Sequence, residues 1–260
     1  MAALDVSITD HIATVTLDRP PVNAVDTATF VELRDAFTAL GADRDVRVAI
    51  FTAAGTRAFM GGADLKSIDN RDDRDSWPPA RIVDRGSAAR EALWAIYDCA
   101  VPVIAAVNGP AIGAGVAFAA VCDIIVAAET ATFGTTEINV GLLGASAQLS
   151  LLVGRHKARE LYFTGELVGA DELHRLGAIR EVVPNDKLLA VATALATSLA
   201  AKSPIALRLA KEAMNRVEFL PLKEAYRTEQ DYTTRLLGYE DSAEARQAFL
   251  EKREPEWRWR

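Results

Sequence analysis

One local order recurs along this chain and restricts what it can fold into: a buried strand, a glycine-bearing turn and then a helix. Residues 46–53 (VRVAIFTA) predict a strand, and FMGGAD (59–64) follows as a turn that opens a short helix from about Ala63. Residues 102–107 (PVIAAV) predict a second strand, and IGAGVA (112–117) opens a second helix. Recurrence of this order favours crossover connections between strands, and therefore predicts an α/β fold.

Local patterns predict the remaining elements. Alternating apolar and polar residues over 12–17 (IATVTL) are typical of a strand. Asp26 is a predicted N-cap for a helix that ends near Gly41, and helical spacing dominates from about Gly144 onward. Further strands are expected at 122–128, 131–133 and 178–183, a helix at about 81–98, and an exposed polar loop at 69–79.

The sequence pattern divides the chain into two parts. Residues 1–200 are predicted to form the α/β core, and residues 201–260 a helical C-terminal region. The helices of the second part are amphipathic, so their apolar faces must be buried on the core or on another subunit.

The composition of the chain limits which partners it could bind and in which cellular compartment it is expected. The 260 residues carry a net charge of −7, which argues against a nucleic-acid or anionic-membrane surface but leaves room for an anionic small ligand. No apolar run is long enough to span a membrane and no secretory signal is recognisable, so a cytoplasmic protein is expected. Cys99 and Cys122 form no paired motif, and buried reduced thiols are predicted.

The usual acid–base and metal-binding groups are sparse. His11, His156 and His174 each stand in a segment typical of a surface or capping residue. None of the usual metal-ligand spacings occurs, and neither the dinucleotide-binding nor the P-loop pattern is complete. We therefore expect no metal and no bound cofactor.

The two glycine-rich turns are the strongest functional candidates. Backbone N–H groups at a helix N-terminus lack intrahelical partners and can bind an anion, although small residues there also permit close packing. Two such turns suggest a pair of N–H donors converging on one oxygen, as in an oxyanion hole for a thioester or ester.

The third candidate is Glu137 in TFGTTEI (132–138), at a predicted helix start. An acidic residue in a first helical turn interacts favourably with the helix dipole, so a purely structural role competes with a catalytic one.

Several ordered motifs together resemble one family, the crotonase superfamily of enoyl-CoA hydratases and isomerases. The similarity covers nearly the whole chain and rests on RPPVNAVD (19–26), AFMGGADLK (58–66), AVNGPAIGAGVAFAAVCDIIVA (106–127), ATFGTTEINVGLLG (131–144), FTGELVGADELHRLGAIREVV (163–183) and SPIALRLAKEAM (203–214). The resemblance implies a spiral core of ββα turns and a helical C-terminal region that builds homotrimers, commonly paired into hexamers.

The same resemblance implies an acyl-CoA thioester substrate, so coenzyme A would enter as part of the substrate. Its carbonyl oxygen would lie between the backbone N–H groups of Ala63 and Ala114. The CoA moiety would be lined by Val22, Ala24, Asp64 and Leu65, and its phosphate met by Lys252 or Arg19, unless these two are simply solvated charges.

One departure from the family pattern bears on the reaction. Hydratases of this family use two glutamates; the first position is Ala117 here, and the second matches Glu137. Alanine cannot transfer a proton, so the retained glutamate is similar to the single base of the isomerases, which shuttles a proton through a thioester enolate.

Two alternatives stay open. The segments 141–149 (GLLGASAQL), 97–109 and 224–236 are similar to crotonase-like hydrolases that open a β-keto ring of steroid-derived CoA thioesters, in which Glu137 would activate water and Trp77 would help to shape a wide pocket. A CoA-binding protein that has lost catalysis is the other alternative, favoured by Ala117 and opposed by Glu137.

Overall fold

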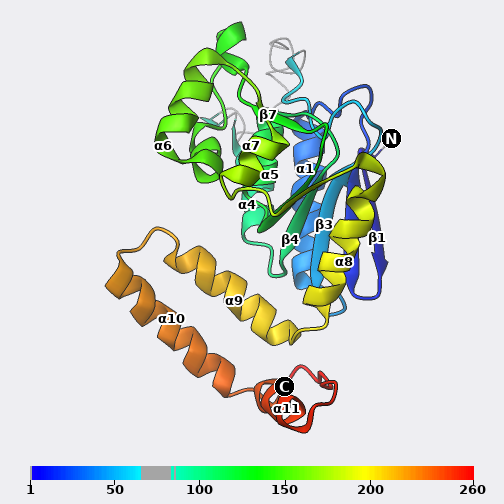
Figure 1. Cartoon of the computed structure of the whole chain (residues 1–260), viewed down its shortest axis with the longest axis vertical. Helices are drawn as coiled ribbons and strands as arrows, with labels where there is room; N and C mark the ends of the chain where they lie inside the picture. Colours follow the sequence, from blue (N-terminus) through cyan, green and yellow to red (C-terminus); the bar gives the residue numbers. More distant parts are fainter. Residues whose placement is uncertain (1, 66–82, 85) are drawn as a thin grey trace.

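The computed structural model describes residues 2–65, 83–84 and 86–260. A six-stranded sheet in the order β1-β2-β3-β4-β6-β9 forms its centre (Figure 1). Its strands are β1 (Leu4–Thr9), β2 (Ile12–Leu17), β3 (Val48–Ala53), β4 (Val103–Val107), β6 (Ile124–Ala128) and β9 (Glu181–Val183). All neighbours from β2 to β9 pair in parallel, whereas β1 pairs antiparallel with β2.

Helices cover both faces of this sheet. On one face α8 (Leu188–Ala200) packs on an apolar layer that includes Ile50, while α1 (Thr27–Ala42), α4 (Ser87–Tyr97) and α5 (Ala114–Ala120) share the other core, which includes Phe51. Successive side chains of a strand point to opposite faces, so every residue of β3 is buried.

A smaller sheet carries the segment that ends in Glu137. It contains β5 (Ala111–Ile112), β7 (Thr132–Gly134) and β8 (Val168–Gly169) in the order β5-β7-β8. After β7 comes the 3-10 helix η2 (Glu137–Val140), and then α6 (Ser146–Thr164), which is kinked at Gly154, and α7 (Ala170–Arg175). These helices lie together beyond one end of the large sheet (Figure 1).

The last helices extend away from the sheet. After η3 (Asn185–Lys187) and α8, the chain forms α9 (Pro204–Val217), α10 (Leu222–Leu237) and α11 (Glu240–Glu251), and α11 lies at the opposite end of the molecule from α6 (Figure 1). Lys211 ties α9 to the core: its buried ammonium donates to Asp123 Oδ2 at 2.7 Å and to two backbone carbonyls at 3.2 Å.

Most local predictions agree with the structure. The strand at 12–17 is confirmed, and Asp26 caps α1 by accepting a hydrogen bond from the backbone N–H of Thr29 at 2.9 Å. Both cysteines are buried and free, as predicted. Within the described ranges, no single helix is long and apolar enough to cross a membrane. One pair of helices bent by 105°, Asn185–Ala200 with Pro204–Val217, would be long and apolar enough if the two were counted together.

Three of the described strands were not predicted. β1 forms a hairpin with β2 through Asp10 and His11, both at positive φ, and β5 and β8 are only two residues long each. The predicted polar loop at 69–79, with Trp77, and all but the start of the short helix predicted from about Ala63 lie outside the described residues. The helix predicted at about 81–98 is described as a regular helix from Ser87.

Candidate active site

The two glycine-rich turns lie against each other. The N–H of Ile112 donates to the carbonyl of Met60 at 2.9 Å, and a β-carbon on Gly115 would lie only 2.4 Å from that carbonyl oxygen. A larger residue than glycine at position 115 would therefore push the helix α5 away from the first turn. The close approach brings the start of α5 beside the segment that contains Ala63.

The backbone of Ala63 is oriented by a parallel bridge to Val25. The N–H of Val25 donates to Gly62 at 2.9 Å and the N–H of Asp64 donates to Val25 at 2.8 Å. In this pattern the backbone N–H and C=O of Val25 both bond to the residues on either side of Ala63. The N–H of Ala63 itself therefore points away from Val25. No hydrogen bond links that N–H to another residue in the described part of the chain.

Ala114 supplies the second backbone donor. It is the first residue of α5, and an N–H in the first turn of a helix has no intrahelical acceptor. Gly113, which precedes it, has φ 53° and ψ −107°, and its own N–H donates to Gly134 at 2.9 Å. This fixes the backbone at the point where Ala114 begins the helix.

The carboxylate of Glu137 lies beside the start of α5. A β-carbon on Gly113 would stand 2.1 Å from Glu137 Oε1, and one on Gly144 would stand 2.8 Å from the same oxygen. The carboxylate is therefore held between two glycines, one of which is bonded directly to Ala114. Sequence patterns gave Gly144 no functional role; its only signal of one is a glycine seven residues after the glutamate.

Glu137 is half-buried and electrostatically unusual. Its Oε2 atom is buried and has no hydrogen-bond partner within the described chain. Loss of water raises the pKa of Glu137 above the ordinary glutamate value, and only a backbone hydrogen bond at Glu137 opposes this. A carboxylate that is poorly solvated and has a raised pKa is suited to taking up and returning a proton.

Ala117 lies one turn along α5 from Ala114 and is buried. A methyl group has no proton to transfer, so this position cannot supply a second acid or base. Among the described residues, Glu137 is the carboxylate that the predicted site places beside the start of α5.

The residues predicted for the CoA moiety lie next to the first turn. The carbonyl of Val22 accepts a hydrogen bond from the N–H of Gly61 at 2.9 Å, and the carbonyl of Ala24 accepts one from Arg19. Arg19 also donates to Asp26 at 2.9 Å and to Asp64 at 3.0 Å. The guanidinium of Arg19 thus pairs with groups of this chain and links residues 24–26 to Asp64 in the first glycine-rich turn. Leu65 follows the turn and is half-exposed.

Lys252 does not join this group within one chain. It ends α11 in a left-handed conformation, and α11 lies at the far end of the molecule from α6 (Figure 1). The fold thus brings together the other predicted residues, from Val22 through Glu137, and leaves this lysine apart.

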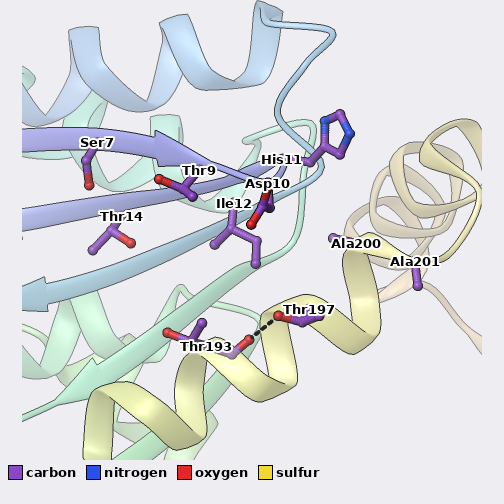
Figure 2. A pocket seen from close by; sticks show the side chains of 10 residues that line it. All are labelled: Ser7, Thr9, Asp10, His11, Ile12, Thr14, Thr193, Thr197, Ala200 and Ala201. Carbon is purple, nitrogen blue, oxygen red and sulfur yellow. Dashed lines mark hydrogen bonds between the residues drawn. The ribbon is translucent and has the colours of Figure 1, made fainter.

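His11 and His174 lie outside the predicted site. His11 stands in the β1–β2 turn with its Nδ1 2.8 Å from the carbonyl of Asp45, and His174 stands in α7 with its Nδ1 2.8 Å from the carbonyl of Ile179. His11 lines a groove of about 370 Å³ between the hairpin and α8, where hydroxyl side chains gather (Figure 2). That groove shares no residue with the Glu137 site. Among the described residues, no cluster of three potential ligands could hold a metal.

Comparison with known proteins gives the family. The enoyl-CoA hydratase/isomerase family model matches residues 7–260. A Rhodococcus jostii protein named (7aS)-7a-methyl-1,5-dioxo-2,3,5,6,7,7a-hexahydro-1H-indene-carboxyl-CoA hydrolase is 40% identical over 246 residues, covering 95% of this chain and 93% of that protein. Carnitinyl-CoA dehydratase of Salmonella enteritidis is 35% identical over 256 residues, covering 96% and 95%.

The solved structures agree with the predicted fold. An enoyl-CoA hydratase from Bacillus anthracis superposes with a TM-score of 0.89 at 32% identity, covering 98% of both chains. This confirms the α/β crotonase fold predicted from the ordered motifs. The chain is an acyl-CoA enzyme and belongs to the enoyl-CoA hydratase/isomerase family.

Proposed function

We propose that this enzyme hydrolyses a carbon–carbon bond in a cyclic β-keto acyl-CoA, with Glu137 as its single catalytic carboxylate. The observation that carries the proposal is one poorly solvated carboxylate beside the Ala114 N–H, with alanine at position 117. The Rhodococcus jostii and Mycobacterium tuberculosis relatives, each 40% identical, are named hydrolases of a fused-ring dioxo carboxyl-CoA. That similarity favours a ring ketone as the target.

A single carboxylate suffices for this reaction. The thioester oxygen accepts hydrogen bonds from the N–H groups of Ala63 and Ala114. Glu137 takes a proton from water as the water oxygen adds to the ring ketone carbon, which is β to the thioester. The bond between that carbon and the α-carbon then breaks, and its electron pair forms the thioester enolate.

The two backbone donors stabilise the enolate oxygen as its negative charge develops. Protonated Glu137 returns its proton to the α-carbon, which restores the carboxylate. The net reaction adds one water, opens the ring to a carboxylic acid and leaves the CoA thioester intact. A raised pKa at Glu137 supports both halves of this proton exchange.

An isomerase is the second candidate. The same lone carboxylate could move a proton between the α- and γ-carbons of an enoyl-CoA through the same enolate, without adding water. Ala117 favours either reaction over hydration by two glutamates.

Heavy-oxygen labelling distinguishes the candidates. 2-Oxocyclohexanecarboxyl-CoA, a fused-ring β-keto acyl-CoA and a straight-chain 3-enoyl-CoA are each incubated with the enzyme in H₂¹⁸O and analysed by mass spectrometry. Carbon–carbon hydrolysis predicts one ¹⁸O in a new carboxyl group of a product that is still a CoA thioester. A shifted double bond with no added mass would establish the isomerase instead, and release of free CoA thiol from the cyclic substrates would contradict the proposal.

We further propose that the enzyme works as a homo-oligomer, a trimer or hexamer. Large apolar side chains on the C-terminal helices and their connections stand exposed in the single chain: Met214, Phe219, Leu222, Phe249 and Leu250. Burial of these exposed side chains against another copy would be favourable. A second copy would also be needed for Lys252 to meet the CoA moiety.

A further inference from the structure

The end of α6 and the residues after it form a wall behind η2, the segment that begins at Glu137. A β-carbon on Gly134, just before that segment, would lie 2.5 Å from a methyl carbon of Leu167. A β-carbon on Gly165 would lie 2.6 Å from the side-chain amide nitrogen of Asn139. Because both approaches are this close, the position of η2 is set by residues near the C-terminal end of α6.

Tyr162 makes the third contact of this wall. Its hydroxyl oxygen accepts a hydrogen bond from the backbone N–H of Gly144 at 3.3 Å. Gly144 in turn lies against the Glu137 carboxylate, since a β-carbon there would be 2.8 Å from Oε1. The chain of contacts therefore runs from the tyrosine hydroxyl through one backbone unit to the carboxylate.

The segment that contains Gly144 has little else to hold it. Gly141 and Ala145 are both left-handed, with φ of 71° and 56°, and such a conformation is strained for alanine. Backbone bonds from Gly141 and Leu142 return only to η2 itself. Within the described chain, the bond to Tyr162 is the one side-chain hydrogen bond that this segment makes.

Tyr162 itself is well anchored. It lies beyond the kink at Gly154, in the part of α6 that ends at Thr164, and its ring packs against the main apolar core. Its hydroxyl therefore presents a fixed acceptor to a segment that has a strained backbone.

We propose that Tyr162 is a positioning residue: its hydroxyl keeps the Gly144 backbone against Oε1 of the Glu137 carboxylate and so keeps water from that oxygen. The inference rests on the proposed function, because it requires Glu137 to be the catalytic base.

Removal of the Tyr162 hydroxyl should change the pKa of Glu137, which a purely structural role of Tyr162 elsewhere would leave unchanged. Without its acceptor, the Gly144 N–H turns toward water and Gly144 withdraws from the carboxylate. Better solvation lowers the pKa of Glu137 toward its ordinary value. No charged side chain among the described residues contributes to the present shift, so water is the variable that changes.

The test compares Tyr162→Phe with Tyr97→Phe in the intact enzyme. Tyr97 is the matched control because its hydroxyl bonds to Glu218, away from the site. For Tyr162→Phe we expect kcat about 5- to 20-fold lower, from loss of one hydrogen bond to a partly buried N–H. We expect KM for the thioester to be unchanged and the acid limb of kcat/KM to move to lower pH. Tyr97→Phe should match the wild type in all three.

A second pair of variants keeps the proposal testable if Tyr162→Phe folds poorly. Gly144→Ala adds a methyl group against Oε1, whereas Gly169→Ala adds one where nothing lies within 4 Å. The proposal predicts a lower kcat with an unchanged KM for the first and wild-type kinetics for the second. Equal behaviour of the two variants, or an unmoved acid limb in a folded Tyr162→Phe enzyme, overturns it.

Glu137→Gln separates this inference from the function on which it rests. If Glu137→Gln keeps wild-type turnover, the proposed catalytic base is wrong. If Glu137→Gln is inactive while Tyr162→Phe behaves as Tyr97→Phe does, only the positioning role is wrong.

Discussion

Gly113 offers the sharpest test of the geometry that joins the glutamate to the start of α5. In Gly113→Ala, the new methyl group would meet Glu137 Oε1 at 2.1 Å, whereas ordinary van der Waals contact begins at 3.4 Å. The carboxylate must retreat until that contact is reached, or the first turn of α5 must shift. Either movement separates the base from the Ala114 N–H.

The structure sets the expected size of the effect. A displacement of about 1 Å in a catalytic group costs roughly 100-fold in rate, so kcat should fall by about that factor. The φ of 53° and ψ of −107° at Gly113 are also unfavourable for alanine, at a cost of about 1–3 kcal/mol in folding stability. Binding of the CoA moiety, which is predicted to lie nearer Val22 and Asp64, should be largely retained.

The assay measures initial rates on the cyclic β-keto thioester at a temperature where urea titration shows the variant to be folded. Gly169→Ala is the control because its methyl group meets nothing within 4 Å. A folded Gly113→Ala enzyme with kcat within two-fold of the wild type would refute the placement of Glu137 against the start of α5.

Three further predictions follow from the charges and surfaces of the fold. Because burial raises the folded pKa of Glu137, its charged form disfavours folding; Glu137→Gln should raise Tm at pH 7, and this gain should vanish below about pH 4, where the wild-type carboxyl is protonated in both states. A Tm gain that persists at low pH would contradict that origin. Lys211→Met should lower the free energy of unfolding in urea by about 3 kcal/mol, since it leaves the carbonyls of Ile96 and Val101 without their buried donor and Asp123 without its cation; a loss under 1 kcal/mol would contradict it. Light scattering should find a homo-oligomer for the wild type and smaller species for Phe249→Glu, which charges an exposed apolar patch; a monomeric wild type would contradict the proposed assembly.

The sequence predicted those parts of the fold that local physics decides. Val48–Ala53 is buried on both faces and reads as a continuous apolar run, and Asp26 caps α1 through a contact only three residues away. The β1–β2 hairpin was missed because its turn residues are Asp10 and His11, which adopt positive φ without glycine. β5 and β8 were missed because two residues are too few to show a period.

The candidate site was predictable only in part. The glycine turns and Glu137 are visible as motifs, because their residue types and order are distinctive. The roles of Gly144 and Tyr162 depend on how α6 packs behind the glutamate, which no local pattern encodes. Lys252 shows the opposite case: its segment resembles a C-terminal basic position of the family, yet the fold of one chain leaves it at the far end from α6.

Turnover by Glu137→Gln tests the central claim most directly. Glutamine keeps the size and the planar end of the side chain but cannot take a proton from water, while the Ala63 and Ala114 N–H groups remain. The measurement compares single-turnover rates on the cyclic β-keto thioester with the affinity for the same compound. We expect the rate to fall by at least about 1,000-fold, within the usual contribution of a general base, with affinity within a few-fold of the wild type. A rate within ten-fold of the wild type would contradict the assignment of Glu137 as the catalytic base.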